Sequence, residues 1–142
     1  MHMKIRHYDP NDYPHVASLY HQSNLYGGQF DENRDSAERL QKRIEADPDA
    51  ILVAENDGAI VGTVSLIEDG RVAWLFRFAV TQGKHEVEAT NLLYESAAKA
   101  LKAKGHTQVL VYSPEGNLKL DTRYARLGFH PGGSYTCYWM NI

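Results

Sequence analysis

The feature that most constrains the fold is the stretch from Phe76 to Gly105, in which a short apolar run passes through a polar turn into a long amphipathic segment. Gly105 stands where a left-handed C-terminal cap belongs, so we expect a helix that ends near Lys104. Apolar or small residues recur every three or four positions, as they do along one face of a helix, namely at Ala89, Leu92, Leu93, Ser96, Ala97, Ala100 and Leu101. The pattern predicts a helix that packs one face against a core.

The run before the turn, from Trp74 to Val80, alternates large and small apolar residues around Arg77 and predicts a mostly buried strand. A strand that leads into a helix N-terminus leaves unpaired backbone N–H groups at one end of the sheet. Such a terminus suits an anion, above all a phosphate. The plain alternative is an ordinary helix start, with Glu86 and Glu88 in the first turn, where the macrodipole favours acidic residues.

The rest of the chain predicts short elements on both sides of this stretch. Asp57-Gly58 and Glu68-Asp69-Gly70 separate three apolar runs, and both are signals for hairpins between antiparallel strands. Asp35 with Glu38 resembles a capping box at a helix start. The remaining predicted elements are a strand at 4–8, helices at 12–23 and 35–47, a strand at 108–112 parallel to the strand before the turn, a helix at 116–127 and a strand at 134–142. We therefore expect one α/β domain over residues 1–142, with a mixed, mostly antiparallel sheet in the order β-α-α-β-β-β-α-β-α-β.

The strand, turn and helix, followed by VLVYSPEGNLKLDTRYARLGF, resemble the GNAT superfamily of N-acetyltransferases. In that family an Arg/Gln-x-x-Gly-x-Gly/Ala turn holds the pyrophosphate of acetyl-CoA through backbone amides. Counted back from the leucine pair of the helix, its positions here are Lys84, Val87 and Ala89, so valine replaces the central glycine.

The closer match lies downstream. Asn117, Tyr124 and the pair Gly128-Phe129 reproduce the family's Asn, Tyr and Leu-Gly-Phe spacing, and seven residues place Asn117 and Tyr124 on one helix face.

The resemblance implies acetyl-CoA as co-substrate. The backbone of Phe78 and Val80 would pair with its pantetheine arm, and Asn117 would hydrogen-bond the same arm. The pyrophosphate would meet the backbone of Lys84, His85, Glu86, Val87, Glu88, Ala89 and Thr90. Tyr124 would act as the general acid, because a phenol with a pKa of about 10 can donate to a leaving thiolate whose parent thiol has a pKa near about 8.5. The alternatives are a Tyr124 ring that only packs at a helix end and an Asn117 that caps the helix.

The acceptor would be a primary amine of a small molecule, amino acid or peptide. Residues 24–32, NLYGGQFDE, form the one long irregular segment, and we expect Tyr26 and Phe30 to bind the acceptor or else to anchor the loop to the core. Arg77 needs an anion, which is either an internal carboxylate or an acidic group on the substrate. The strand before the turn lacks a glutamate that could be the general base, so the base stays open among a water chain and Asp31, Glu32, Glu68, His85 and Glu86.

Composition narrows the other possibilities. The net charge of −3 gives no reason to expect nucleic acid, and no apolar run approaches the length of a membrane span. The single cysteine, Cys137, excludes an internal disulfide and is expected as a buried small hydrophobe in a cytoplasmic protein. The seven histidines lack metal-ligand spacing, so no metal is expected. A homodimer is left open, as is the competing hypothesis of an acyl-CoA sensor that has lost catalysis.

Overall fold

The computed structural model describes residues 2–22 and 30–142. These residues belong to two compact units, and the boundary between the units lies between residues 112 and 113. The elements of the first unit are β1 (Met3–His7), the 3-10 turn η1 (Pro10–Asp12), α1 (Tyr13–Gln22), α2 (Ala37–Ala46), the 3-10 turn η2 (Pro48–Ala50), β2 (Ile51–Asn56), β3 (Ala59–Glu68), β4 (Ala73–Val80) and α3 (Glu86–Ala103). The second unit contains α4 (Leu118–Leu127). Most of the expected elements are therefore present, within a few residues of their predicted bounds.

The four strands of the first unit form one antiparallel sheet in the order β1-β2-β3-β4. The turn between β2 and β3 is the expected Asp57-Gly58 pair, and both residues have positive φ, 51° and 84°. Positive φ at both central residues is the requirement of the tight turn that best matches the twist of two antiparallel strands. The prediction of three consecutive antiparallel strands is confirmed.

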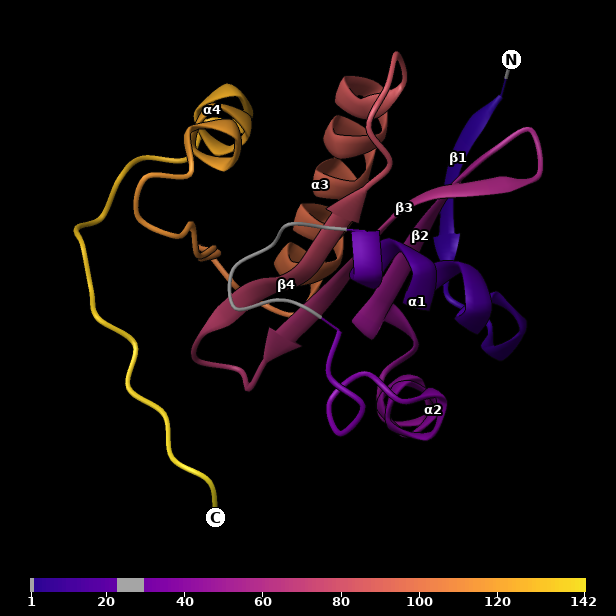
Figure 1. Cartoon of the computed structure of the whole chain (residues 1–142), viewed down its shortest axis with the longest axis horizontal. Coiled ribbons are helices and arrows are strands. Elements are labelled where there is room, and N and C mark those ends of the chain that lie inside the picture. Colours follow the sequence, from indigo (N-terminus) through magenta and orange to yellow (C-terminus); the bar gives the residue numbers. More distant parts are fainter. Residues whose placement is uncertain (1, 23–29) are drawn as a thin grey trace. The chain divides into compact units, whose positions relative to one another are not determined.

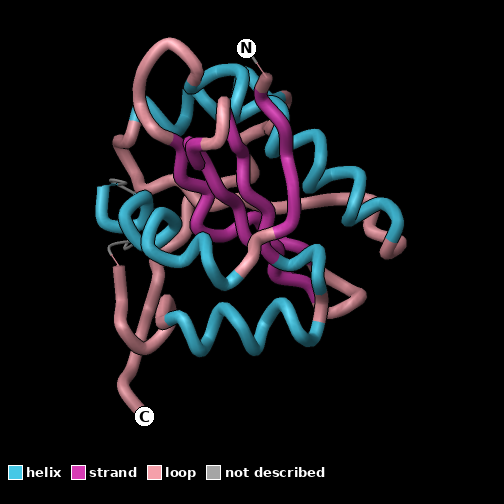
Figure 2. The backbone as a smooth tube through the Cα atoms, turned by 90° about the vertical axis from the view of Figure 1, so that its right-hand side faces the viewer, coloured by secondary structure: helices cyan, strands magenta, loops and turns pink. Residues whose placement is uncertain are grey.

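Helices cover both faces of this sheet (Figure 1). The long helix α3 runs along one face and contacts all four strands, while α1 lies on the other face against β3 and β4. Figure 2 shows the strands enclosed between these two helical layers. The apolar cluster on the α1 face includes Val16, Leu19 and Tyr20 of α1 with Val53 and Ala79 of the sheet. The amphipathic pattern of α3 likewise puts Ala89, Leu93, Ala97 and Leu101 fully or almost fully out of solvent.

The strand predicted at 108–112 is reduced to one residue pair. Leu110 forms an isolated parallel bridge with Trp74: the Leu75 N–H donates to the Leu110 carbonyl at 3.0 Å, and the Leu110 N–H donates to the Ala73 carbonyl at 2.9 Å. The Tyr112 ring stacks on Trp74 with 4.5 Å between ring centroids. The predicted parallel direction is right, but the predicted length is wrong because the pairing stops after one bridge.

In the second unit, α4 ends at Leu127 as predicted and begins two residues after the predicted start at Gly116. The Asn117 side chain caps it by accepting from the Leu120 N–H at 3.0 Å, and Gly128 ends it with φ 101°. Residues 129–142 carry no regular secondary structure, so the strand predicted at 134–142 is wrong. Cys137 is exposed rather than buried, which corrects a second expectation for this segment. Aromatic residues favour strands only where a pleated neighbour accepts them, so their presence alone does not make one.

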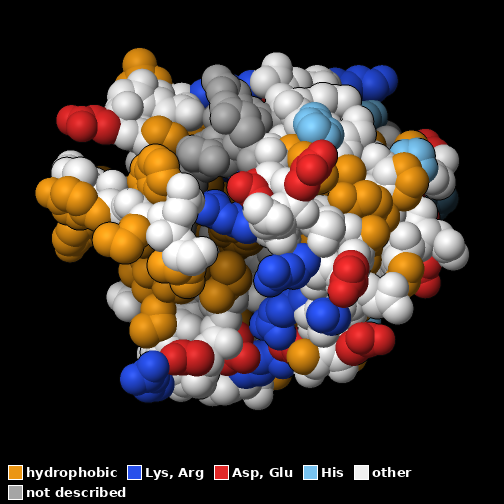
Figure 3. Space-filling view, turned by 60° about the horizontal axis from the view of Figure 1, so that its bottom comes forward, with side chains coloured by type: hydrophobic (Ala, Val, Ile, Leu, Met, Phe, Trp, Pro, Cys, Tyr) orange, Lys and Arg blue, Asp and Glu red, His pale blue; other side chains and the backbone are white. Residues whose placement is uncertain are grey.

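Charged side chains of both signs lie side by side on the face drawn in Figure 3. The exposed ion pairs of the first unit include Lys42 with Glu38 and Arg71 with Asp69, at 3.4 and 2.7 Å. Solvent screens such pairs, so each contributes little to stability. In residues 2–22 and 30–142, no helix is long and apolar enough to cross a membrane. Across the same residues, no group of three or more His, Cys, Asp or Glu side chains is arranged to hold a metal ion.

Candidate active site

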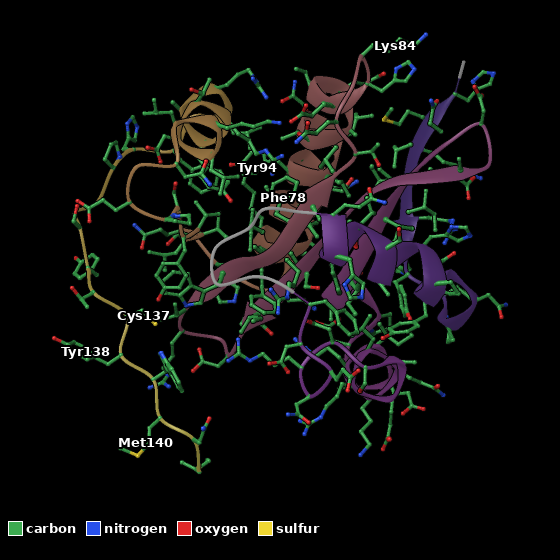
Figure 4. All side chains as sticks on the ribbon, viewed as in Figure 1. Phe78, Lys84, Tyr94, Cys137, Tyr138 and Met140 are labelled. Atoms are coloured by element: carbon green, nitrogen blue, oxygen red, sulfur yellow. The ribbon has the colours of Figure 1, made fainter. Side chains whose placement is uncertain are left out.

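The polar turn between β4 and α3 places an uncapped helix start directly after a buried strand. β4 ends at Val80, α3 begins at Glu86, and Gly83 in the turn has φ 140°, a conformation that side chains disfavour. His85 occupies the N-cap position without forming a side-chain cap hydrogen bond. The Glu86 N–H donates to the Gly83 carbonyl at 3.2 Å. The other N–H groups of a first helical turn have no partner within the helix, and they suit this end to an anion. Figure 4 shows Lys84 at the tip of the connection.

The seven residues expected at the pyrophosphate divide into two groups in the structure. Residues 84–88 are exposed or half-buried, and Val87, where the resemblance places the family's central glycine, is 47% exposed. Ala89 and Thr90 are fully buried, and the Ala89 N–H already donates to the His85 carbonyl at 3.0 Å. Residues 84–88 are therefore accessible from solvent at the helix start, while Ala89 and Thr90 are packed in the interior.

Side chains of opposite charge lie close together in the sequence at this turn. Lys84 and His85 stand just before the helix, and Glu86 and Glu88 occupy its first turn. A phosphate at the helix start would gain from the macrodipole and from Lys84, and would lose part of that gain to the two carboxylates. The donor set fits a phosphate through its backbone, with weaker support from side-chain charge than an all-basic turn would supply.

β4 contains a bulge shortly before it reaches the turn. Two of its residues, Arg77 and Phe78, lie opposite the single residue Val64 of β3, and Arg77 has φ 51°. Phe78 is 2% exposed and Val80 is 8% exposed, so both side chains belong to the core. Figure 4 shows Phe78 on β4 upstream of the turn. Any contact between these two residues and a ligand would have to use their backbone.

Arg77 bonds to an internal carboxylate, the first of the two alternatives that its burial left open. Its Nε and Nη2 atoms donate to Oδ1 and Oδ2 of Asp35 at 3.1 and 2.8 Å, and both side chains are less than 5% exposed. Asp35 is therefore not the cap of α2, which corrects the predicted capping box. Ser36 caps that helix, accepting from the Arg39 N–H at 3.2 Å. Sequence reasoning missed Asp35 as a partner, and the only signal for it was the need of a buried arginine for an anion.

The segment expected to meet the acceptor is described from Phe30 onward, and Tyr26 lies outside the described residues. The Phe30 ring stacks on His21 with 4.2 Å between centroids and packs against the apolar cluster of the α1 face. Phe30 therefore anchors this end of the segment, whatever else it does. Asp31 accepts from the N–H groups of Asn33 and Arg34 at 2.8 and 3.0 Å, so its carboxylate closes a local turn.

Two of the candidate general bases have pKa values below the usual range. The N–H groups of Arg34 and Asn33 lower the pKa of Asp31, and a hydrogen bond from His106 lowers that of Glu68. The His106 Nε2 atom lies 2.7 Å from Oε1 of Glu68. A carboxylate with a lowered pKa holds a proton less well, which makes both residues weaker bases than an unperturbed carboxylate.

Tyr124 lies in α4 and is 8% exposed. Burial raises the pKa of its phenol, against an opposing effect of Arg123, so the hydroxyl keeps its proton at neutral pH. The ring meets Phe129 edge-on with 5.7 Å between centroids. Both chemical expectations for Tyr124, a packed ring and a protonated donor, are compatible with these facts.

Comparisons with known proteins place this arrangement in a family. The model of the acetyltransferase (GNAT) domain matches residues 16–137. Acetyltransferase plu1384 of Photorhabdus laumondii is 28% identical over 115 residues, which cover 81% of this chain and 78% of that protein.

Two solved structures share the fold. AAC(6')-Iy in complex with a bisubstrate analogue has a TM-score of 0.78 at 19% identity, with both chains fully covered. The paiA N-acetyltransferase of Thermoplasma acidophilum, solved with coenzyme A, has a TM-score of 0.70 at 22% identity, with 89% of each chain covered. The matched domain model spans most of the sequence, and the chain therefore belongs to the GNAT family of acetyltransferases.

Proposed function

We propose that this chain is a single N-acetyltransferase domain that moves the acetyl group of acetyl-CoA to a primary amine. The observation that carries the proposal is the uncapped start of α3 directly after β4, in a chain of the GNAT family. The amine nitrogen attacks the thioester carbonyl, the carbon–sulfur bond breaks, the amine loses a proton and the leaving thiolate gains one. No covalent bond to the enzyme is required.

In this proposal the backbone N–H groups of residues 84–88 hold the pyrophosphate, apart from that of Glu86, which donates to the Gly83 carbonyl. Backbone rather than side chains does this work, so Val87 at the family's glycine position weakens close approach without removing the donors. Ala89 and Thr90, both buried, set the depth at which α3 sits on the sheet. The backbone of Phe78 and Val80 pairs with the pantetheine arm.

Tyr124 and Asn117 complete the proposed cofactor chemistry. Tyr124 donates a proton to the leaving thiolate, a role for which its protonated phenol is suited. The Asn117 side-chain oxygen caps α4, and its NH₂ group can donate to the pantetheine arm. The capping role and the cofactor role use different atoms of one side chain, so they do not compete.

The acceptor is an amine of a small molecule, amino acid or peptide, and it enters over the connection between α1 and α2. This connection carries Tyr26 and Phe30, which supply apolar contact, and Asp31 and Glu32, which attract a cationic amine. AAC(6')-Iy is described as an aminoglycoside N-acetyltransferase, and its full-length structural match supports an amine acceptor here. The guanidinium of Arg77 already forms an ion pair with the buried carboxylate of Asp35. We therefore do not propose that Arg77 binds an acidic group of the substrate.

A thermal-shift titration with acetyl-CoA and with CoA, followed by thiol-release assays on a panel of amines, tests this function. Enzyme and sensor both predict stabilisation by the cofactor, since a ligand that binds only the folded state raises the melting temperature. Turnover with an amine supports the enzyme. Stabilisation without turnover on any amine favours the sensor, in which the valine at the turn marks lost catalysis. Absence of stabilisation at about millimolar cofactor, where even weak sites fill, would contradict both.

A further inference from the structure

The buried pair Arg77–Asp35 joins two segments far apart in the sequence. Arg77 belongs to the bulge of β4, and Asp35 ends the connection that precedes α2. Both side chains are almost completely out of solvent, and two hydrogen bonds of 2.8 and 3.1 Å join them. Planar bidentate contact of this kind fixes the relative orientation of its two partners as well as their distance.

The backbone of Arg77 needs such support. Its φ of 51° lies in the left-handed region, which a long side chain adopts only where the surroundings hold it there. The guanidinium is also enclosed by rings, since its carbon lies 4.8 Å from the centroid of Phe76 and 5.8 Å from that of Tyr20. The ion pair and these two rings hold the side chain of Arg77 in place, and the backbone of the same residue forms part of the bulge.

The Asp35 end of the pair is equally constrained. Its Oδ2 atom also accepts from the Asp31 N–H at 2.9 Å, and its own N–H donates to the Asp31 carbonyl at 2.8 Å. The Asp35 carbonyl accepts from the Tyr13 hydroxyl at 2.8 Å, which ties the same residue to α1. One residue therefore connects the end of the α1–α2 segment to α1 and to β4.

We propose that Arg77 is a positioning residue: its pair with Asp35 sets the β4 bulge and residues 30–35 in register with each other. This inference rests on the proposed function and deepens it, since there the β4 backbone pairs with the pantetheine arm of acetyl-CoA and the α1–α2 segment meets the amine. A common anchor then fixes the distance between the two reacting groups. Misplacement by about 1 Å can cost about 10²-fold in rate, so a rigid joint at this point has a direct kinetic consequence.

The variants Arg77→Gly and Arg77→Ala distinguish the effect of the ion pair on the β4 bulge from its effect on residues 30–35. Both remove the ion pair, but glycine adopts a φ of 51° without strain, whereas alanine does not. Arg77→Gly should keep the bulge and free residues 30–35. Arg77→Ala should loosen both the bulge and residues 30–35. Amide hydrogen exchange of the cofactor-free protein, followed over residues 30–36 and 75–80, reads each segment directly.

The expected result is exchange about 10-fold or more faster over 30–36 in both variants, and faster over 75–80 in Arg77→Ala alone. The control is Arg71→Ala, which removes an exposed ion pair with Asp69 before β4 and should change neither segment. If either variant fails to fold because Asp35 is left as a buried lone charge, the comparison is repeated in an Asp35→Asn background, where no buried charge remains.

Kinetics with the best amine complete the test. Both variants should lower kcat, because both remove the anchor, and the loss should be larger, about 10²-fold, in Arg77→Ala, where the bulge is released as well. Equal exchange over 75–80 in the glycine and alanine variants, or unchanged exchange over 30–36, would overturn the proposal. The exchange measurement needs no cofactor, so it decides the role of the pair even if the wild-type protein transfers no acetyl group and the proposed function fails.

Discussion

Gly62 of β3 lies directly against Leu93 of α3. A Cβ atom built on Gly62 would stand 2.9 Å from Cδ1 of Leu93, 3.3 Å from Cγ2 of Val80 and 3.4 Å from the Ala79 carbonyl oxygen. Leu93 is fully buried, so its side chain cannot simply turn into solvent to make room. The missing side chain of Gly62 thus allows α3 to sit close to the sheet, with its first turn at the end of β4.

Gly62→Ala should destabilise the fold by about 1–2 kcal/mol, because an added methyl group in a filled core forces neighbouring side chains to move. Denaturant unfolding measures this change in the free energy of unfolding. The double variant Gly62→Ala/Leu93→Ala is the control, since truncating Leu93 makes room for the new methyl group. A double variant that loses the full sum of the two single losses would show that the contact is not the cause.

Val87→Gly should tighten the binding of CoA. The substitution restores the glycine that the resemblance to GNAT enzymes implies at this position and removes an exposed side chain from the helix start. It should also cost about 0.5–1 kcal/mol of stability, because glycine frees the backbone of a first helical turn. Equilibrium titration of CoA measures the affinity. Val72→Gly, at an exposed valine outside the turn, controls for general loosening, and weaker CoA binding by a folded Val87→Gly protein would show that the phosphate site lies elsewhere.

Tyr124→Phe should leave stability and acetyl-CoA affinity nearly unchanged and lower kcat about 10²-fold or more, because it removes only the hydroxyl that we propose as the proton donor. Steady-state kinetics with a good amine give the comparison. Tyr135→Phe, at a tyrosine that is 86% exposed in the same unit, is the matched control and should have no effect. A Tyr124→Phe enzyme that turns over at the wild-type rate would remove Tyr124 from the mechanism.

The raised pKa of Tyr124 makes the same role testable by pH. A general acid works in its protonated form, and burial moves the loss of that proton above the ordinary tyrosine value of about 10. Tyr124 should therefore cause no decline of kcat between about pH 7 and pH 10. An alkaline decline inside that range that disappears in Tyr124→Phe would show that the phenol ionises earlier than its burial implies.

Phe30→Ala should raise the KM for the amine and leave the KM for acetyl-CoA nearly unchanged if this ring lines the acceptor entrance. Because Phe30 also stacks on His21, some loss of stability is expected, and His21→Ala controls for it by removing the stacking partner alone. Equal losses for both substrates, or equal effects of the two variants on the amine KM, would make Phe30 a structural anchor and place the acceptor site elsewhere.

Elements with a strong local pattern could be predicted from the sequence. The helix after the turn, the Asp57-Gly58 hairpin and the Gly105 cap with its φ of 93° each depend on residues close together in the chain, and all three are present. The strands predicted at 108–112 and 134–142 depended on the composition of the segment alone. A strand exists only where a neighbour pairs with it, and the first of these segments pairs at Leu110 only, while the second forms no strand.

The candidate site shows the same division. The residues of the turn could be found by counting along the chain, since strand, turn and helix are consecutive. Asp35 could not be found in this way, because its partner Arg77 is 42 residues away and its spacing to Glu38 imitates a helix cap. Long-range partners of buried charges require the fold before they can be named.

The central claim is acetyl transfer, and its most direct test follows both products of the reaction. Purified protein is incubated with acetyl-CoA and each member of an amine panel, while thiol release is recorded and the amine is analysed by mass spectrometry. The account predicts one acetylated primary amine for each CoA released, with release far above the amine-free rate. CoA release that does not depend on any amine, or the absence of an acetylated product across the panel from a protein that binds acetyl-CoA, would contradict it.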